Sequence, residues 1–255
     1  MSGTLKASGA LAVIWAILAL VSLWPGGLAV TIHEGDTLHF IDITERMARG
    51  QVPHLDFSTP IGGGAFWPVA ALVQAGMSMG AAYLTAQAIL GALFGVLAFV
   101  VAATRVNWGW SLAFGFLVVA ITMSLVHGEA SLGISISMHY NRWAWALSFI
   151  ALLMAILPTE SNSKAFDGVV LGAVMAALLL IKVTYFAVLA PLVVIALLLT
   201  AQRMVLSIGL AFGLFLVVLL TAFVGPGYWL AYLGDLLAVV GSDVRPQPGL
   251  NLSQI

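Results

Sequence analysis

Residues 81–103 read AAYLTAQAILGALFGVLAFVVAA, a stretch without a single charged side chain. An α-helix rises ~1.5 Å per residue, so a helix of this length crosses the ~30 Å hydrocarbon core of a bilayer. The stretch lacks the alternation of polar and apolar residues that a strand of a membrane barrel requires. Because backbone polar groups in lipid must bond within their own segment, we expect a transmembrane helix here.

The composition of the whole chain is also that of a membrane protein. Of its 255 residues, 62% are hydrophobic and 7% are charged, and the mean hydropathy is +1.11. Soluble domains carry roughly 25% charged residues, so this chain cannot cover a water-facing surface. A net charge of −1 provides no basic field for nucleic acid, which we do not expect as a partner. The absence of cysteine excludes disulfides and thiolate metal sites.

Similar apolar stretches recur along the chain and predict an all-α, polytopic transmembrane bundle of about seven spans, forming a single domain over 1–255. The expected spans are 9–31, 81–103, 109–127, 142–158, 168–181, 183–201 and 204–224. The fifth and sixth are separated where Lys182, Thr184 and Tyr185 interrupt the apolar run. Residues 225–255 are more polar and contain three prolines, so we expect an outward loop. The chain stops inside that loop, and we therefore expect it to be truncated.

The segment 61–80 allows two interpretations. It is apolar, but it contains a run of three glycines at 62–64, and Pro68 follows. It either spans the membrane or dips into it and returns. If it does not cross, Arg105, Lys164 and Arg203 lie on the side of the N-terminus, and Arg142 and Lys182 face outward. The distribution of positive charge does not decide between the two, because the two sides carry similar numbers of cations in either case.

The loop 32–60 between the first span and this segment holds the largest cluster of charge in the chain. At 100° per residue its middle forms an amphipathic helix, which we expect to lie along the membrane surface and to end at Gly50. The apolar face carries Phe40, Ile43 and Met47, and the opposite face carries Asp42, Glu45, Arg46 and Arg49. The four charged residues form two i,i+4 pairs, and we expect them only to be solvated.

Glu34 and Asp36 come just before that helix and are separated by a glycine. Two carboxylates so close repel each other, so either the pKa of one is raised or a cation lies between them. Either state would suit a general base or a metal ligand. The alternative is that one of them caps the following helix. His54 and Asp56 return an imidazole and another carboxylate to the membrane surface at the end of the loop.

Several short motifs in this order resemble the GT-C glycosyltransferase superfamily. The first loop contains the acidic pair, the amphipathic helix, Pro-His-Leu-Asp-Phe at 53–57 and Thr-Pro-Ile-Gly at 59–62. Met-His-Tyr-Asn-Arg at 138–142 and the run around Lys182 are similar to later parts of the same family. The nearest branch contains protein O-mannosyltransferases and the aminoarabinose transferase of lipid A. One departure is Glu-Gly-Asp at 34–36, where the family often has Asp-Glu or Asp-x-Asp.

The resemblance implies transfer of a sugar from a polyprenyl-phosphate donor to a glycan, lipid or protein acceptor. It places the first loop in the periplasm of a bacterial inner membrane, and the segment 61–80 against the membrane without crossing it. Asp36, or else Glu34, would take the acceptor's proton, and Arg142 and Lys182 would bind the departing phosphate. His54, Asp56 and Tyr140 would line the substrate site. No cofactor is implied, and a divalent metal is an open alternative.

Other interpretations compete with these. Lys182 also fits a lysine that extends to the membrane interface, and Arg142 beside Trp143 and Trp145 fits an interfacial anchor. For the whole chain, a transporter or lipid flippase is the alternative, with charges near the membrane midplane and symmetry between two halves. Neither feature is visible in the sequence. A non-catalytic membrane protein is the third possibility.

Overall fold

The computed structural model describes residues 3–24, 34–124, 136, 138–159 and 164–240, and these residues form helices without a β-strand. The predicted all-α class is therefore confirmed for the described part of the chain. The helices are α1 (Gly3–Leu23), α2 (Glu34–Ala48), η1 (Gly63–Ala65), α3 (Trp67–Gln74), α4 (Met79–Ala103), α5 (Trp108–Met123), α6 (His139–Ile156), α7 (Lys164–Ile181), α8 (Val183–Leu199), α9 (Arg203–Val224) and α10 (Gly227–Val240).

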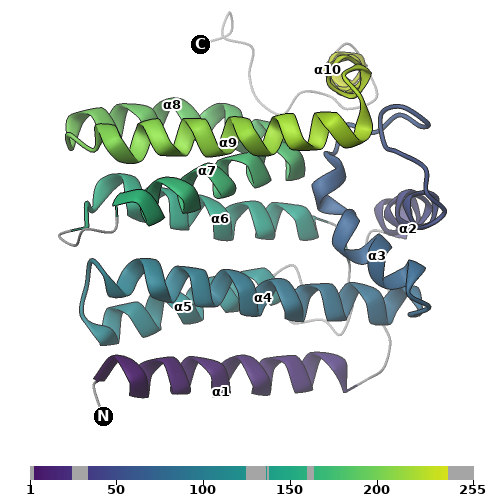
Figure 1. The fold of residues 1–255 in the computed structure, drawn as a ribbon. Helices are drawn as coiled ribbons and strands as arrows, with labels where there is room; N and C mark the ends of the chain where they lie inside the picture. Colours follow the sequence, from purple (N-terminus) through teal and green to yellow (C-terminus); the bar gives the residue numbers. More distant parts are fainter. Residues whose placement is uncertain (1–2, 25–33, 125–135, 137, 160–163, 241–255) are drawn as a thin grey trace, which may run out of the picture.

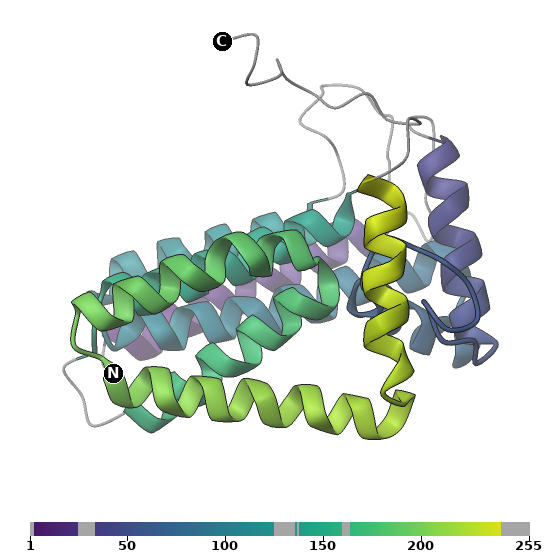
Figure 2. The same cartoon turned by 90° about the horizontal axis from the view of Figure 1, so that it is seen from above.

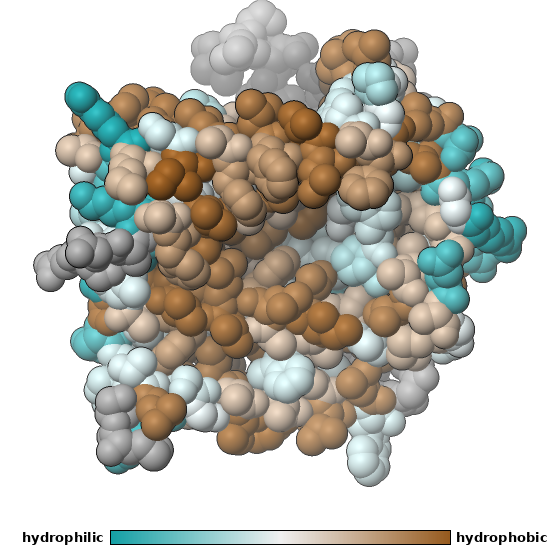
Figure 3. All heavy atoms as spheres, in the orientation of Figure 1, coloured by the Kyte–Doolittle hydropathy of each residue, from teal (hydrophilic) through white to brown (hydrophobic). Residues whose placement is uncertain are grey.

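The helices α1 and α4 to α9 lie side by side in a layered bundle (Figure 1). Four helices, α1, α4, α7 and α9, are long and apolar enough to cross a membrane. Apolar side chains cover the middle of the face in Figure 3, and hydrophilic ones gather at its two ends. This distribution is that of a membrane protein, as predicted. The count of about seven spans stays a prediction, because α5 and α8 are shorter.

Two helices of the bundle pack through glycines. Gly168 and Gly172 on α7 face Gly209 and Gly213 on α9, and each pair is spaced by four residues. A Cβ at Gly172 would lie 2.5 Å from the carbonyl oxygen of Gly209, so the two backbones touch. Such small-residue stripes allow close contact between membrane helices, where the hydrophobic effect provides little attraction.

The segment 61–80 forms two short helices, η1 and α3. The eight residues of α3 extend about 12 Å, less than half of the hydrocarbon thickness. The glycines before it pack on the end of α7, because a Cβ at Gly62 would lie 1.9 Å from the carbonyl oxygen of Leu180. These glycines thus allow η1 to approach the bundle closely.

Two helices lie across the same end of the bundle. Both α2 and α10 appear end-on in Figure 1 and lengthwise, roughly parallel to each other, in Figure 2. The chain turns from α9 into α10 at Gly225, whose φ of 90° and ψ of 157° are accessible to glycine and strained for other residues. The loop expected over 225–255 is therefore wrong for 227–240, which form a helix. Residues 241–255 lie outside the described part.

Other boundaries differ slightly from the expected ones. The first span begins at Gly3 rather than at residue 9, and residues 25–31 of its expected range lie outside the described part. The break between the fifth and sixth spans at Lys182 is confirmed. The amphipathic helix is also confirmed, but it begins at Glu34, so the acidic pair lies in its first turn rather than before it.

The opposite end of the bundle carries its own charges. The turn after α4 holds Arg105, which forms an ion pair with Asp167 near the start of α7, and both side chains are buried. The directions of the helices in Figure 1 place Lys164 and Arg203 at this end and Arg142 and Lys182 at the other. The start of α1 also lies at the Arg105 end (Figure 1), and whether residues 61–80 cross the membrane stays a prediction.

Candidate functional site

Lys182 lies between α7 and α8, where the backbone is extended and the helix is interrupted. Its Nζ donates a hydrogen bond to Oδ1 of Asn141 at 2.9 Å and lies 4.8 Å from the ring centroid of Tyr140. The second contact is a cation–π interaction, which orients the ammonium group over the ring face. The structure therefore brings together two of the predicted substrate-binding residues, Tyr140 and Lys182.

Arg142 follows Asn141 on α6, and its side chain is buried. Its Nη1 donates to the backbone carbonyl of Ser124 at 2.6 Å, at the end of α5. The guanidinium therefore ties the end of α5 to the start of α6, at the same end of the bundle as Lys182. His139, on the same turn of α6, is fully buried, and its Nε2 lies 2.8 Å from the carbonyl oxygen of Ala65.

The helix α2 packs against this start of α6 through Phe40. The Phe40 ring lies 5.7 Å from Tyr140 and 5.6 Å from Phe66, centroid to centroid. Asp36 precedes Phe40 by four residues and so shares its face of the helix. Asp36 is half-buried, whereas Glu34 is exposed on the opposite face. The two predicted catalytic candidates thus differ in position, and Asp36 is the one on the side of α6.

The end of the first loop contacts α10. His54 Nδ1 lies 2.7 Å from Oδ2 of Asp235, and the same oxygen accepts a hydrogen bond from the backbone N–H of Thr59 at 3.0 Å. The His54 ring stacks on Tyr232 at 4.3 Å and meets Tyr228 edge-on at 5.2 Å. We call His54, Tyr228, Tyr232 and Asp235 the α10 clasp.

Burial dominates the electrostatics of the clasp. It lowers the pKa of the His54 imidazole below its ordinary value, and the neighbouring Asp235 carboxylate only partly opposes this shift. Burial also raises the pKa of Tyr232 to about 12. The lowered pKa favours the neutral imidazole at pH 7, with its Nδ1 facing the carboxylate oxygen of Asp235. Its Nε2 is buried and has no hydrogen-bond partner among the described residues.

Asp56 has a local role in the loop. Its carboxylate accepts a hydrogen bond from the backbone N–H of Val52 at 2.6 Å, and the side chain is exposed. Among the described residues, no contact links Asp56 with Lys182 or with the clasp. Sequence reasoning missed Asp235, which it placed in a featureless loop. The available signal was the spacing of Tyr228, Tyr232 and Asp235, which puts three polar groups on one face of an apolar stretch.

Tyr232 lies close to the end of α7 that precedes Lys182. Its hydroxyl lies 3.1 Å from the position that a Cβ on Gly62 would take, and Gly62 packs on Leu180, two residues before Lys182. The clasp and Lys182 therefore lie at the same end of the bundle. No three His, Asp or Glu side chains gather into a metal-binding group in the described part of the chain.

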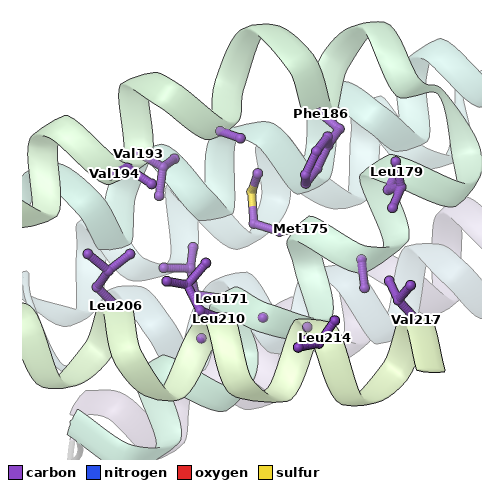
Figure 4. A pocket seen from close by; sticks show the side chains of 15 residues that line it. Leu171, Met175, Leu179, Phe186, Val193, Val194, Leu206, Leu210, Leu214 and Val217 are labelled. Atoms are coloured by element: carbon purple, nitrogen blue, oxygen red, sulfur yellow. The ribbon is translucent and has the colours of Figure 1, made fainter. Parts of the chain in front are cut away.

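An apolar cavity of about 260 Å³ lies between α7, α8 and α9 (Figure 4). Val194 and Leu206 lie at one end of it, and Leu179 and Val217 lie at the other. Leu179 precedes Lys182 by three residues in the chain, whereas the Lys182 side chain itself contacts Asn141 and Tyr140 on α6. Apart from the Met175 sulfur, the side chains lining the cavity are hydrocarbon.

Comparison with known proteins adds no assignment. No protein-family model, no curated protein and no solved structure matches this chain.

Proposed function

We propose that this chain is a GT-C-like glycosyltransferase, which moves a sugar from a polyprenyl-phosphate donor to a glycan, lipid or protein acceptor. The observation that carries the proposal is the position of Lys182. Its ammonium group contacts the ring of Tyr140, which packs against Phe40 of α2, and Leu179 and Phe186, on either side of it in the chain, line the apolar cavity. A donor with a hydrocarbon tail and a charged phosphate needs an apolar site for the tail and a cation for the phosphate, at the depth where lipid meets water.

The apolar cavity and Lys182 support the donor half of the proposal. The cavity accommodates part of a prenyl chain, because its lining offers hydrocarbon and almost no polar atoms. Lys182 then lies near the phosphate and offsets the charge that develops as the phosphate departs. Arg142 lies at the same end of the bundle and would add a second positive charge.

The geometry of α2 supports the acceptor half. Asp36 lies on the face that packs towards α6, so it is the better candidate for the base that takes the acceptor's proton. Glu34 is exposed and more remote. His54 would shape the far side of the site through the clasp, and Asp56 would only order its loop. We further propose that the end of the bundle that carries Lys182 faces the periplasm of a bacterial inner membrane, and that residues 61–80 do not cross that membrane.

The test compares carboxylates on the two faces of α2. Asp36→Asn, Glu34→Ala and Asp42→Ala are reconstituted in proteoliposomes, in the natural full-length context, with sugar-loaded polyprenyl-phosphate donors and a mixed acceptor pool. Loss of a catalytic base costs typically 10²–10⁴-fold in rate, so Asp36→Asn should abolish detectable transfer. The solvated control Asp42→Ala should keep it. Unchanged transfer in both Asp36→Asn and Glu34→Ala, with the proteins inserted and folded, would remove the catalytic assignment.

A binding measurement separates the donor half. Lys182→Gln should weaken the binding of a polyprenyl phosphate while leaving the binding of the uncharged polyprenol unchanged. Equal losses for both lipids would indicate that Lys182 only supports the fold. No difference for either lipid would place the donor phosphate elsewhere.

A further inference from the structure

The outer face of α10 is apolar and exposed. Leu230, Leu233 and Leu237 are 76%, 52% and 61% exposed, and they lie on the face opposite the clasp. Asp235 is the one charged residue in this helix, and it is turned inward to His54. A helix lying in water at this end would therefore expose three leucines and no charge, which is unfavourable because apolar surface is costly to keep in water.

The neighbouring helix α2 shows what a water-facing helix at the same end looks like. Its outer face carries Asp42, Glu45 and Arg46, and Phe40, Ile43 and Met47 are turned inward. Both helices lie across the same end of the bundle (Figures 1 and 2), so both would lie in the plane of a membrane that the bundle crosses. The two therefore meet different environments, although they have the same orientation.

The apolar face of α10 continues the exposed surface of the bundle. Phe223, near the end of α9, is 81% exposed, and the chain turns directly from it into α10. Trp229 fixes this turn, because its Nε1 donates to Oγ1 of Thr221 on α9 at 2.7 Å. Exposed apolar side chains therefore continue from the end of α9 onto α10, and tryptophan is common at the interface of a membrane with water.

We propose that α10 is an in-plane helix whose leucine face is embedded in the hydrocarbon boundary of the bilayer, while its clasp face holds the first loop. The occupant of the leucine face is lipid rather than a second copy of the chain. A helix of this length offers a strip of roughly 21 Å by 10 Å, which is far below the ~800 Å² per partner of a stable interface. The inference stands independently of the proposed glycosyl transfer.

The absence of cysteine from the sequence makes a direct test possible. Leu233→Cys and Leu237→Cys, with Glu45→Cys as the matched control on α2, are spin-labelled in liposomes. Collision rates with oxygen, which concentrates in lipid, and with a water-soluble nickel chelate are then measured at each site. We expect oxygen to dominate at both α10 sites and nickel to dominate at Glu45→Cys.

Two outcomes would overturn the proposal. Nickel dominating at the α10 sites, as on α2, would place the leucine face in water. Exclusion of both reagents there, with a label-to-label coupling that rises with protein density, would show a second copy covering it. Each labelled variant is checked by its unfolding midpoint, and Leu230→Cys provides a third, independent position if one label disturbs the helix.

Discussion

The helices α2 and α10 are amphipathic in opposite senses. The first buries Phe40, Ile43 and Met47 against the bundle and turns Asp42, Glu45 and Arg46 outward. The second turns Tyr228, Tyr232 and Asp235 inward, towards His54, and turns its leucines outward. Both lie across one end of the same bundle (Figure 2). The inward face of a membrane-protein helix is therefore not identified by its hydrophobicity alone, because the outer environment is lipid in one place and water in another.

The two helices are consequently held by different forces. Burial of apolar surface fixes α2, with an added hydrogen-bonded contact of 3.0 Å between the hydroxyls of Thr44 and Tyr83 on α4. A polar clasp fixes α10, in which one carboxylate oxygen serves both His54 and the N–H of Thr59. Substitutions that remove each attachment separately test this difference.

The largest effect is expected for Phe40→Ala on α2. The Phe40 ring is buried among Phe66, His139 and Tyr140, and its removal leaves a cavity that costs ~3–5 kcal/mol. Hydrogen exchange of the α2 amides in micelles should become at least 100-fold faster, while α10 amides keep their protection. The control is Leu38→Ala, at a side chain that is 65% exposed. Equal loosening of both helices would show that they form one cooperative unit.

A smaller effect, confined to α10, is expected for Asp235→Ala. The substitution leaves His54 and the Thr59 N–H without their acceptor, which costs ~1–3 kcal/mol. Exchange of the amides over 227–240 should accelerate by roughly 5- to 150-fold, with α2 unchanged. Asp235→Asn keeps one acceptor oxygen and should be milder. If α10 keeps full protection in Asp235→Ala, the aromatic stacking rather than the carboxylate holds the helix.

The pH dependence of the clasp follows from His54. Its pKa in the docked state lies below the ordinary value of 6.5, so the undocked state binds the proton more readily. Docking of α10 is therefore most stable above pH 6.5 and weakens as the pH falls from 6.5 towards the lower docked-state pKa. Tyr228, Tyr232 and Asp235 are the titratable groups that face this ring.

Exchange protection factors of α10, measured between pH 5 and 8 and corrected for intrinsic rates, test this sign. Protection should decline on the acid side in the natural chain, and the decline should disappear in His54→Gln. The helix α1 serves as the internal control, since none of the histidine contacts described above involves it. Protection that rises at low pH would mean that the charged pair with Asp235 outweighs the burial of His54.

Helical periodicity in the sequence predicted those features of this end of the bundle that depend on residues one helical turn apart. The inner face of α2 and its two outer ion pairs are confirmed as expected, because each depends on residues one turn apart. The break at Lys182 is also confirmed, because a cation within an apolar run leaves a local signal. The all-helical class follows from composition and segment length in the same way.

The attachment of α10 could not be predicted in that way. His54 and Asp235 are far apart in the chain, and nothing local marks them as partners. The three prolines and the polarity of 225–255 favoured a loop, and the apolar run over 227–240 is too short to signal a span. The contact of Gly62 with Leu180 was likewise inaccessible, since three glycines indicate backbone freedom but not what approaches them.

The smallest effect is expected on the outer face of α2, where charge meets water. The pairs Asp42–Arg46 and Glu45–Arg49 have nitrogen–oxygen distances of 2.8 Å and 3.0 Å and are largely exposed. Exposed i,i+4 pairs contribute ~0.3–0.5 kcal/mol and are screened by salt. Glu45→Ala should therefore lower α2 protection about twofold in low salt and leave it unchanged at 1 M salt. A loss that persists at high salt would show that Glu45 has a partner beyond Arg49, and that the outer face of α2 is engaged rather than simply solvated.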